Sequence, residues 1–367
     1  MILGQVGKYI AVTMVFLGNL FPVSLSFGQQ TSVPKASSAT SQEGNTTKNG
    51  KELEYTEDFS ILTLKGSRFF PLPPALGQVD DYPQNSFIRE RWQLGWRPAD
   101  PIDLFICKPR GVAKPPVILF LYSYPGTTDR FKSDDWCSAV TAQGFAGAGF
   151  LSANTGHRLE MKSPVTTFFT DFQESLGATV HDVQMILDYL TTRADLDMNR
   201  VGMFGQGSGG SIAILASAAD ARIKAIEVVT PWGDWPEFFA TSRFVSKDHR
   251  AKFTSSEFLA KVANLDPQNW LPKVQARSLR IQNVRNSGPM PDALQERLEA
   301  VAPETALIDQ YGDPAALVPR SGTLFPWLWA QLQPDAKPQA VLEKSERIHF
   351  YPAKDVNPLP PVVMPKN

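Results

Sequence analysis

The sequence predicts an α/β protein in which helices cover both faces of a mostly parallel sheet. Strand-like and helix-like segments alternate along most of the chain, which is the order expected for parallel strands joined by crossover helices. Residues 117–121 are apolar at every position, as in a strand that is buried on both faces. A glycine-rich segment at residues 205–210 joins another buried strand to a stretch of small apolar residues. Sheets of this class bind ligands at the carboxyl ends of their strands.

Each predicted element follows from a local pattern of side chains. Apolar residues recur at helical spacing between Val180 and Leu190, which is typical of a helix with one buried face. Further helices are expected at residues 134–143 and 212–219. The strands are expected first at residues 89–94 and 102–106, as antiparallel edge strands, and then at residues 117–121, 144–150, 200–204, 223–229, 279–284 and 306–310.

The composition excludes several classes of protein. Of the 367 residues, 43% are hydrophobic and 20% are charged, which excludes a mostly disordered chain. Lys and Arg number 36 and Asp and Glu number 37, so the net charge is −1 and no basic field is available to hold a nucleic acid. The two cysteines and four histidines have no spacing suited to zinc. We therefore expect no metal, no cofactor and no nucleic-acid partner.

The N-terminus has the pattern of an export signal. A single positive residue, Lys8, precedes a mostly apolar run over residues 9–27, and small residues lead up to Gly28. We predict that residues 1–28 are a signal peptide cleaved after Gly28 and that the protein is exported, either periplasmic or secreted. An uncleaved N-terminal membrane anchor is the alternative, although Pro22 weakens the run as a spanning helix. After cleavage, no stable membrane insertion is expected.

Composition divides the rest of the chain into three parts. Residues 29–58 are rich in Ser, Thr, Asn, Lys and Gln and predict a flexible tether. Residues 59–334 carry the predicted strands and helices of one domain. Residues of about 232–272, between two late strands of this domain, are expected to be largely helical. Residues 335–367 are rich in proline and are expected to form an extended tail on the surface.

The two cysteines allow one disulfide. Cys107 lies in a strand-like run and Cys137 in a helix-like one. Export permits a disulfide, and a bond between them would close a loop worth about 3–4 kcal/mol in the chain-entropy model. Two buried free thiols fit the sequence equally well, so both alternatives stay open.

Residues 200–210 carry the most specific motif. The strand ends in Gly-Gln-Gly-Ser-Gly-Gly at residues 205–210 and leads directly into a helix of small residues. This pattern resembles the nucleophile elbow of the α/β-hydrolases, in particular the branch of dienelactone hydrolases and prolyl-oligopeptidase-like enzymes. The resemblance covers roughly residues 102–331 and implies an α/β-hydrolase fold in which residues of about 232–272 form a small helical lid over the site. A dinucleotide-binding loop fits poorly, because the segment follows the fourth or fifth strand rather than the first.

The residue in the nucleophile position departs from the family's pattern. The resemblance implies a serine between Gly205 and Gly209, and that position holds Gly207. Ser208 stands one position later, where the family's residue gives its backbone N–H to the oxyanion hole. Glycine accepts the positive φ angle of a strained elbow without cost. The turn can therefore survive while the hydroxyl is lost.

The acid and histidine positions depart from the pattern as well. The resemblance implies an acid after the strand at residues 279–284, where Asn286 stands, and a histidine near residues 311–314, where there is none. An amide cannot stabilise an imidazolium by charge. His181 and His249 are interpreted as structural or surface residues. Removing the serine or the histidine of such a triad lowers turnover by about 10⁶.

Three hypotheses about function follow. The first is an exported α/β-hydrolase-fold protein with a degenerate triad, which binds a small-molecule or peptide-like ligand, or a protein partner, without fast hydrolysis. The second is an active esterase or acyl-peptide hydrolase with a rebuilt site, in which Ser208 is the nucleophile. Its base would be His157 or His349 and its acid Asp313 or Asp234, although Asp234 also reads as a turn residue. The third is a purely structural protein with a filled pocket.

A pocket beside the elbow would take its residues from a rim loop and from the lid. Ser123 and Tyr124 belong to the rim loop, and Ser208 supplies the oxyanion amide. Trp232 and Trp235 in the lid either line an apolar ligand cavity or pack the lid onto the sheet.

Overall fold

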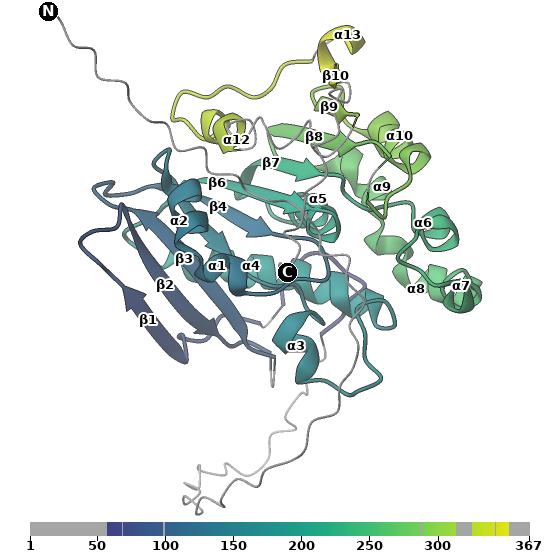
Figure 1. Ribbon diagram of the computed structural model, residues 1–367, viewed down its shortest axis with the longest axis horizontal. Helices are drawn as coiled ribbons and strands as arrows, with labels where there is room; N and C mark the ends of the chain where they lie inside the picture. Colours follow the sequence, from purple (N-terminus) through teal and green to yellow (C-terminus); the bar gives the residue numbers. More distant parts are fainter. Residues whose placement is uncertain are drawn as a thin grey trace, which may run out of the picture. The chain divides into compact units, whose positions relative to one another are not determined.

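The computed structural model describes residues 57–67, 69–97, 100–286, 288–312, 325–341 and 343–351. The predicted signal peptide, Asp313 and all but the last two residues of the predicted tether lie outside these ranges. In the described part of the chain, ten strands form one sheet in the order β1-β2-β3-β5-β4-β6-β7-β8-β9-β10 (Figure 1). No helix within these ranges has the length and hydropathy that a membrane span requires.

The sheet is mostly parallel, as predicted. A run of neighbouring strands pairs in parallel: β5 (Ala146–Gly149), β4 (Pro116–Leu121), β6 (Asp197–Gln206), β7 (Ile223–Val229), β8 (Ser278–Val284), β9 (Leu307–Tyr311) and β10 (Ile348–Tyr351). Antiparallel pairing joins the other strands at one edge: β1 (Leu76–Asp80), β2 (Phe87–Leu94) and β3 (Ile102–Pro109). Because β1 pairs outside β2, the strand predicted at residues 89–94 is the second of the sheet and not its edge.

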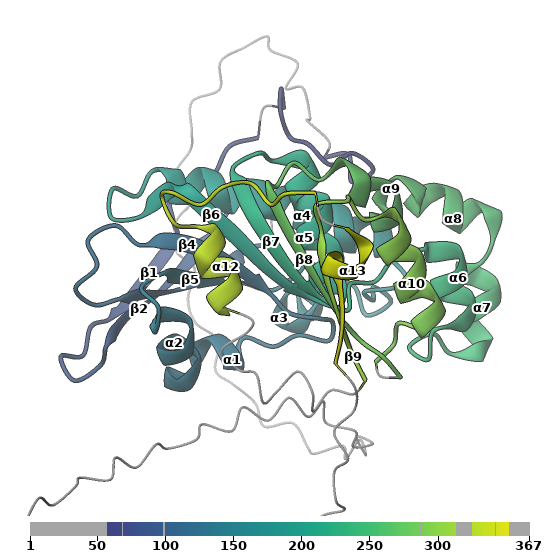
Figure 2. The same cartoon turned by 90° about the horizontal axis from the view of Figure 1, so that it is seen from above.

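Helices cover both faces of this sheet, and Figure 2 shows α4 and α5 on one side with α1 and α2 on the other. The helices before the elbow are α1 (Asp129–Lys132), α2 (Asp134–Thr141), α3 (Gly156–Glu160) and α4 (Phe172–Thr191). The elbow leads into α5 (Ser208–Ala219), and α6 (Trp235–Thr241), α7 (Lys247–Phe253), α8 (Ser256–Val262) and α9 (Pro267–Trp270) follow β7. The last helices are α10 (Asp292–Val301), α12 (Phe325–Gln331) and α13 (Lys344–Arg347).

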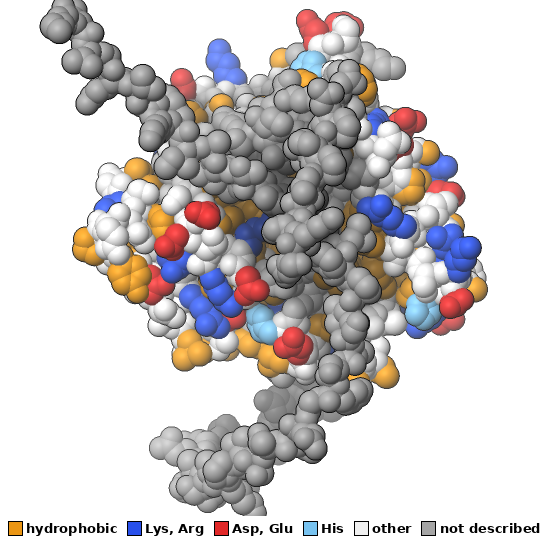
Figure 3. All heavy atoms as spheres, viewed as in Figure 1, with side chains coloured by type: hydrophobic (Ala, Val, Ile, Leu, Met, Phe, Trp, Pro, Cys, Tyr) orange, Lys and Arg blue, Asp and Glu red, His pale blue; other side chains and the backbone are white. Residues whose placement is uncertain are grey.

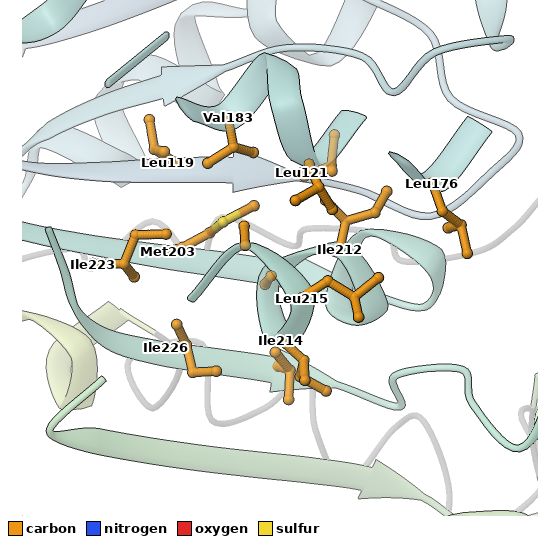
Figure 4. Packing of buried hydrophobic residues seen from close by; sticks show 14 of the residues in the cluster. Leu119, Leu121, Leu176, Val183, Met203, Ile212, Ile214, Leu215, Ile223 and Ile226 are labelled. Carbon is orange, nitrogen blue, oxygen red and sulfur yellow. The ribbon is translucent and has the colours of Figure 1, made fainter. Parts of the chain in front are cut away.

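The alternation of side chains along β4 explains why its sequence is apolar throughout. Leu119 and Leu121 belong to the core that contains α4 and α5, whereas Ile118 and Phe120 belong to a second core with α2 and α12. Successive side chains of a strand point to opposite faces, so a strand covered on both faces has no exposed position. Figure 4 shows Leu119 and Leu121 close to Val183 of α4 and Ile212 of α5.

Cys107 and Cys137 form a disulfide, which decides between the two alternatives that the sequence left open. Cys107 lies in β3 and Cys137 in α2. Both residues are fully buried in the second core. The bond therefore links α2 to β3, one of the antiparallel strands of the sheet.

Residues 57–64 are held against α4 by hydrogen bonds. His181 of α4 lies with Nδ1 2.6 Å from Glu57 Oε1 and Nε2 2.8 Å from the Ile61 carbonyl oxygen. Gln184, one turn later, bonds the backbone N–H of Leu64 at 2.8 Å. A Cβ atom on Gly177 would lie 2.9 Å from the Phe59 carbonyl carbon, so this glycine permits the close approach. His181 is fully buried, and its role here is structural.

A buried ionic network continues from this contact into the core. Arg97 pairs with Glu57 through two hydrogen bonds of 2.7 and 2.9 Å and with Asp182 at 3.2 Å. Arg158 holds Asp100 through bonds of 2.9 and 2.8 Å and lies 2.9 Å from Asp182 Oδ2. Since each buried charge faces an opposite charge, removal of one partner would leave the others uncompensated.

The described residues of the predicted tail depart in part from an extended surface segment, and residues 352–367 lie outside the described ranges. Residues 348–351 form β10, which pairs in parallel with β9. The ring of Tyr351 stacks on that of Tyr311, with centroids 4.9 Å apart. The outer edge of β9 would otherwise carry unpaired backbone groups. The described sheet therefore extends beyond the domain end that we predicted at residue 334.

Candidate functional site

The turn between β6 and α5 has the backbone of a nucleophile elbow. Gly207 lies between strand and helix with φ 53° and ψ −120°, a conformation that residues with side chains rarely adopt. A Cβ atom on Gly205 would lie 2.7 Å from the Gly209 carbonyl carbon, and one on Gly209 would lie 2.6 Å from the Leu121 carbonyl carbon. The close approach of these backbones therefore requires the glycines of the motif.

Side chains from two other loops fill the space beside Gly207. A Cβ atom on Gly207 would overlap the Ser123 hydroxyl, and it would lie 2.8 Å from Ser123 Cβ and 3.1 Å from Trp232 Nε1. Ser123 follows β4 and Trp232 follows β7. The position where the related pattern carries a nucleophile thus has neither a side chain nor room for one.

Ser208 is buried at the first position of α5. Its Oγ accepts a hydrogen bond of 2.8 Å from the backbone N–H of Tyr124, and the residue is only 1% exposed. Within the described ranges, no histidine shares a hydrogen bond with this hydroxyl. The loop that contains Tyr124 is the one that supplies the second oxyanion amide in this kind of site. In this structure, one backbone amide of that loop donates to the Ser208 hydroxyl.

The two histidines considered as alternative bases each lie near a carboxylate. His157, in α3, lies with Nε2 3.5 Å from Asp103 Oδ2. His349, in β10, lies with Nδ1 3.1 Å from Asp309 Oδ1. Three strands separate β10 from β6, and neighbouring strands are about 4.8 Å apart. His349 is therefore on a strand about 19 Å from the one that leads to Ser208. His249, on α7, bonds the hydroxyl of the nearby Ser246.

The residues considered for the acid are turn residues. Asn286 follows β8 with φ 55°, and its backbone N–H donates to Asp292 Oδ1 at 2.8 Å. Asp234 precedes α6 with φ 57°, and its carboxylate accepts a hydrogen bond of 2.6 Å from Arg297 Nη1. Asp234 is thus engaged in an ion pair between α6 and α10, which favours its interpretation as a turn residue.

Trp232 and Trp235 lie inside an aromatic cluster. Both are 1% exposed. Trp232 stacks on Phe238 with centroids 5.2 Å apart, and Trp235 packs edge-on against Phe172 at 4.8 Å. Trp235 Nε1 donates a hydrogen bond of 3.0 Å to the Leu265 carbonyl oxygen. Trp235 packs α6 against α4, and Trp232 packs against α6. Neither ring lines the cavity described next.

A cavity of about 180 Å³ lies at the carboxyl ends of β4, β5 and β6. Ser123 contributes from the loop after β4, Ser152 and Thr155 from the loop after β5, Gln206 from the end of β6, and Arg130 from α1. Of these, the sequence singled out Ser123. The others have no local pattern, and the signal that could have found them is their place just after predicted strands, where ligands bind.

The groups around this cavity carry little negative charge. Its described lining residues include no Asp or Glu, and burial raises the pKa of the Tyr122 phenol. Tyr124, which the sequence placed in the pocket, is not among the lining residues and stacks on Phe168 instead. The Arg130 guanidinium lies 4.0 Å from the centre of the Tyr122 ring. Within the ranges that the structure describes, no group of three or more His, Cys, Asp or Glu side chains is arranged to hold a metal ion. On the molecular face drawn in Figure 3, Lys and Arg side chains are interspersed with Asp and Glu.

Solved structures establish the fold class, and no protein-family model matches the sequence. The chain is similar to an acetyl xylan esterase from Paenibacillus sp. R4, with a TM-score of 0.53 and 17% identity over 71% of this chain and 90% of that one. It is also similar to an acylaminoacyl peptidase of Pyrococcus horikoshii, with a TM-score of 0.54 and 16% identity over 70% and 44% of the two chains. A third similar structure, 2,6-dihydroxy-pseudo-oxynicotine hydrolase, has a TM-score of 0.50 and 16% identity over 70% and 71%. These likenesses show the α/β-hydrolase fold that the elbow motif predicted.

Proposed function

We propose that this protein is a non-catalytic α/β-hydrolase-fold protein that binds a small ligand at the carboxyl edge of its sheet. The observation that carries the proposal is the environment of Gly207. The elbow backbone is intact, yet the nucleophile position holds glycine and the Ser123 side chain fills the space beside it. Loss of the nucleophile from such a site lowers turnover by about 10⁶. A binding protein derived from this fold would retain the elbow backbone and the loops around it without the nucleophile.

The contacts of Ser208 do not favour a rebuilt hydrolase. A general base must lie within about 2.6–3.2 Å of the hydroxyl that it deprotonates, or reach it through one water. Ser208 is buried against the Tyr124 amide, and His157 and His349 face Asp103 and Asp309. A serine in this setting caps a backbone amide of the rim loop. It supports the pocket wall and performs no chemistry.

The size of the cavity favours a small ligand over a peptide-like one. Pockets for drug-sized ligands have volumes of about 300–1,000 Å³, and the cavity beside the elbow has about 180 Å³. The similar structures include an acetyl xylan esterase and an acylaminoacyl peptidase, so an acyl-bearing molecule or its acid product is a reasonable ligand class. An open cavity also sets this proposal apart from a purely structural role.

Export is part of the proposal. The apolar run before Gly28 has the pattern of a signal peptide, and disulfides such as Cys107–Cys137 persist in oxidising compartments. A retained N-terminal anchor is the alternative topology. Mass spectrometry of the protein from its own cells distinguishes them, since a chain that begins after Gly28 supports cleavage and an intact N-terminus supports the anchor.

Fluorophosphonate labelling tests the absence of a nucleophile. The wild-type chain is compared with Ser208→Ala and Ser123→Ala, and an active serine hydrolase serves as the positive control. We expect no labelling of any form of the chain and no turnover of p-nitrophenyl acetate above the rate in buffer. Labelling of the wild type that disappears in Ser208→Ala would establish the rebuilt hydrolase instead. Labelling that disappears in Ser123→Ala would show that a serine from the rim loop has taken over the nucleophile's role.

A further inference from the structure

We infer that a groove between α10 and β10 binds a short extended peptide whose two termini are both charged. The groove has a volume of about 870 Å³, within the range of about 300–1,000 Å³ that is typical of ligand sites. Its described lining residues come from α10, from β9 and β10, from the residues after β8 and from the end of α13. Figure 2 shows α10 and α13 at the β9 end of the sheet. None of these lining residues belongs to the elbow, so the inference is independent of the function proposed above.

Carboxylates gather at the end of the groove where α10 begins. Asp292, the first residue of α10, and Glu296, one turn later, both line the groove. Asp292 Oδ1 accepts a hydrogen bond of 2.8 Å from the backbone N–H of Asn286, and Asp292 has no ion-pair partner among the described residues. The Glu296 side chain is 68% exposed, and its carboxylate lies 3.9 Å from Arg285 Nη1. This end of the groove is therefore negative unless Arg285 offsets both charges.

The charge of Arg285 is already balanced by a third carboxylate. Arg285 Nη2 donates to both oxygens of Glu299, at 2.9 and 3.0 Å. Glu299 also accepts bonds of 2.6 Å from Asn283 Nδ2 and 2.7 Å from Gln310 Nε2, and it is only 6% exposed. This buried pair is complete in itself. The two carboxylates at the start of α10 remain to attract a positive group of a ligand.

A guanidinium without a counter-charge marks the opposite end of the groove. Arg347 is the last residue of α13 and lines the groove. Its Nη1 donates to the Pro303 carbonyl oxygen at 3.2 Å, just beyond the end of α10. Its Nε is buried without a hydrogen-bond partner, and no described carboxylate forms an ion pair with it. Because buried donors are normally paired and a carboxylate matches a guanidinium in charge and geometry, this end favours an anionic group.

The separation of the two charged ends sets the length of the ligand. Helix α10 runs along the groove between them and has ten residues, or about 15 Å at a rise of about 1.5 Å per residue. Glu296 lies one turn inside the helix, so the ends are about 10–15 Å apart. An extended peptide covers about 3.3 Å per residue, and three or four residues therefore span the groove. A single amino acid carries both charges but is too short to reach both ends.

The wall between the ends suits the middle of a peptide. Ile348 and Phe350 are alternate residues of β10, so their side chains lie on the same face of the sheet, and both line the groove. Phe350 is 62% exposed, which leaves its ring open to an apolar side chain. Asn286 also lines the groove, and its side-chain amide can both donate to and accept from a peptide group. A fatty acid or a phosphate would place no positive group beside the carboxylates of α10.

Isothermal titration of the full chain tests the inference with the tetrapeptide Ala-Phe-Ala-Ala as the probe. Three forms are compared at constant ionic strength: one with free ends, one acetylated at the N-terminus and one amidated at the C-terminus. We expect saturable binding of the free-ended form. The amidated form should bind at least about tenfold more weakly, because a hydrogen bond between charged groups contributes that factor. The acetylated form should bind about threefold more weakly, since exposed carboxylates interact less strongly.

Two variants assign each end of the peptide to its partner. Arg347→Gln should weaken binding of the free-ended form at least about tenfold and leave the amidated form at its already lower affinity. Glu296→Gln should weaken binding of the free-ended form about threefold and leave the acetylated form unchanged. Arg297→Gln and Glu304→Gln are the matched controls, because they remove one charge of each sign from residues that do not line the groove. Both controls should bind all three forms as the wild type does.

Several results would overturn the inference. These are equal binding of the three forms, a loss in Arg347→Gln that is as large for the amidated form as for the free-ended one, and no binding of any form. Binding that appears only in a chain truncated after Tyr351 would also overturn it, since residues 352–367 would then occupy the groove themselves. The comparison of the three forms on the wild-type chain holds even where a variant fails to fold.

Discussion

Ser123 and Gly207 lie 84 positions apart in the chain, and their contact closes the nucleophile position of the elbow. Ser123 Cβ is 2.8 Å from the point where a Cβ atom on Gly207 would stand, a separation that real Cβ atoms essentially never show. The Ser123 side chain therefore occupies the space that a side chain at residue 207 would need.

We expect Gly207→Ser to destabilise the protein without creating hydrolytic activity. A φ of 53° at Gly207 costs a residue with a side chain about 1–3 kcal/mol. Overlap with Ser123 adds about 1–3 kcal/mol of overpacking. Urea unfolding should therefore show a loss of about 2–6 kcal/mol, and ester hydrolysis should stay at the background rate.

Gly111→Ser is the matched control for this substitution. Gly111 has φ 82°, and nothing lies within 4 Å of its Cβ position. The stability lost in the control therefore comes from backbone strain alone. If Gly207→Ser is no less stable than Gly111→Ser, Ser123 does not fill the space as described. If it hydrolyses esters, the triad is not degenerate in the way that we propose.

The buried ionic network predicts a large effect of Arg158→Leu. Arg158 is 1% exposed and pairs with Asp100 and Asp182, so its removal leaves two buried carboxylates uncompensated. Loss of one partner of such a network costs about 3–5 kcal/mol. Arg110→Leu is the control, because Arg110 pairs with Asp81 at the exposed surface and such pairs contribute about 0–1 kcal/mol. Equal unfolding free energies for the two variants would contradict the network's role.

The lowered pKa of Asp100 predicts that the protein loses stability in acid. Burial alone would raise its pKa, but the hydrogen bonds and charge of Arg158, with the charge of Arg97, lower it to about 2. A carboxyl with a lowered folded-state pKa stabilises the fold above its unfolded pKa of 3.8, and this contribution is lost as the pH falls toward 2. It amounts to about 2 kcal/mol. Unfolding free energies between pH 5 and 2 should fall less steeply in Asp100→Asn, and parallel curves would exclude Asp100 as the source.

The raised pKa of Glu227 predicts the opposite dependence of stability on pH. Burial raises its pKa well above the ordinary 4.5, although Arg280 beside it acts to lower it. A carboxyl with a raised folded-state pKa contributes stability below its unfolded pKa, and this contribution is lost as the pH rises above 4.5. Glu227→Gln mimics the protonated form and keeps the partners Arg280 and Gln282. Its stability relative to wild type should therefore increase between pH 4.5 and 8, and a constant difference would count against the raised pKa.

The disulfide predicts a measurable loss of stability on reduction. Cys107 and Cys137 are 30 positions apart, and closing a loop of that length is worth about 3–4 kcal/mol in the chain-entropy model. The double variant Cys107→Ala/Cys137→Ala should unfold at a lower urea concentration by a corresponding amount. Its midpoint should not respond to reductant, whereas the wild-type midpoint should. Two free thiols in the protein from its own cells would contradict the bond.

Much of the fold could be predicted from local patterns, because the central strands are covered on both faces. The strand predicted at residues 223–229 is β7 (Ile223–Val229) in the structure. The two outermost strands, β1 and β10, were not predicted, because a strand that is not covered on both faces lacks a continuous apolar pattern. Leu76 and Val79 of β1 are mostly exposed, so no buried stripe marks the strand, and its pairing with β2 depends on backbone groups that any sequence provides.

The sequence by itself determined the elbow turn and the glycine at residue 207. A turn at φ 53° between a buried strand and a tightly packed helix needs glycine, and the identity of residue 207 can be read directly. Only the tertiary structure decided what surrounds that position. Ser123 fills the space beside Gly207, Ser208 bonds the amide of Tyr124, and Arg130 lies at the cavity. These contacts join segments that are far apart along the chain and meet only because parallel strands end at one edge of the sheet, so no local pattern records them.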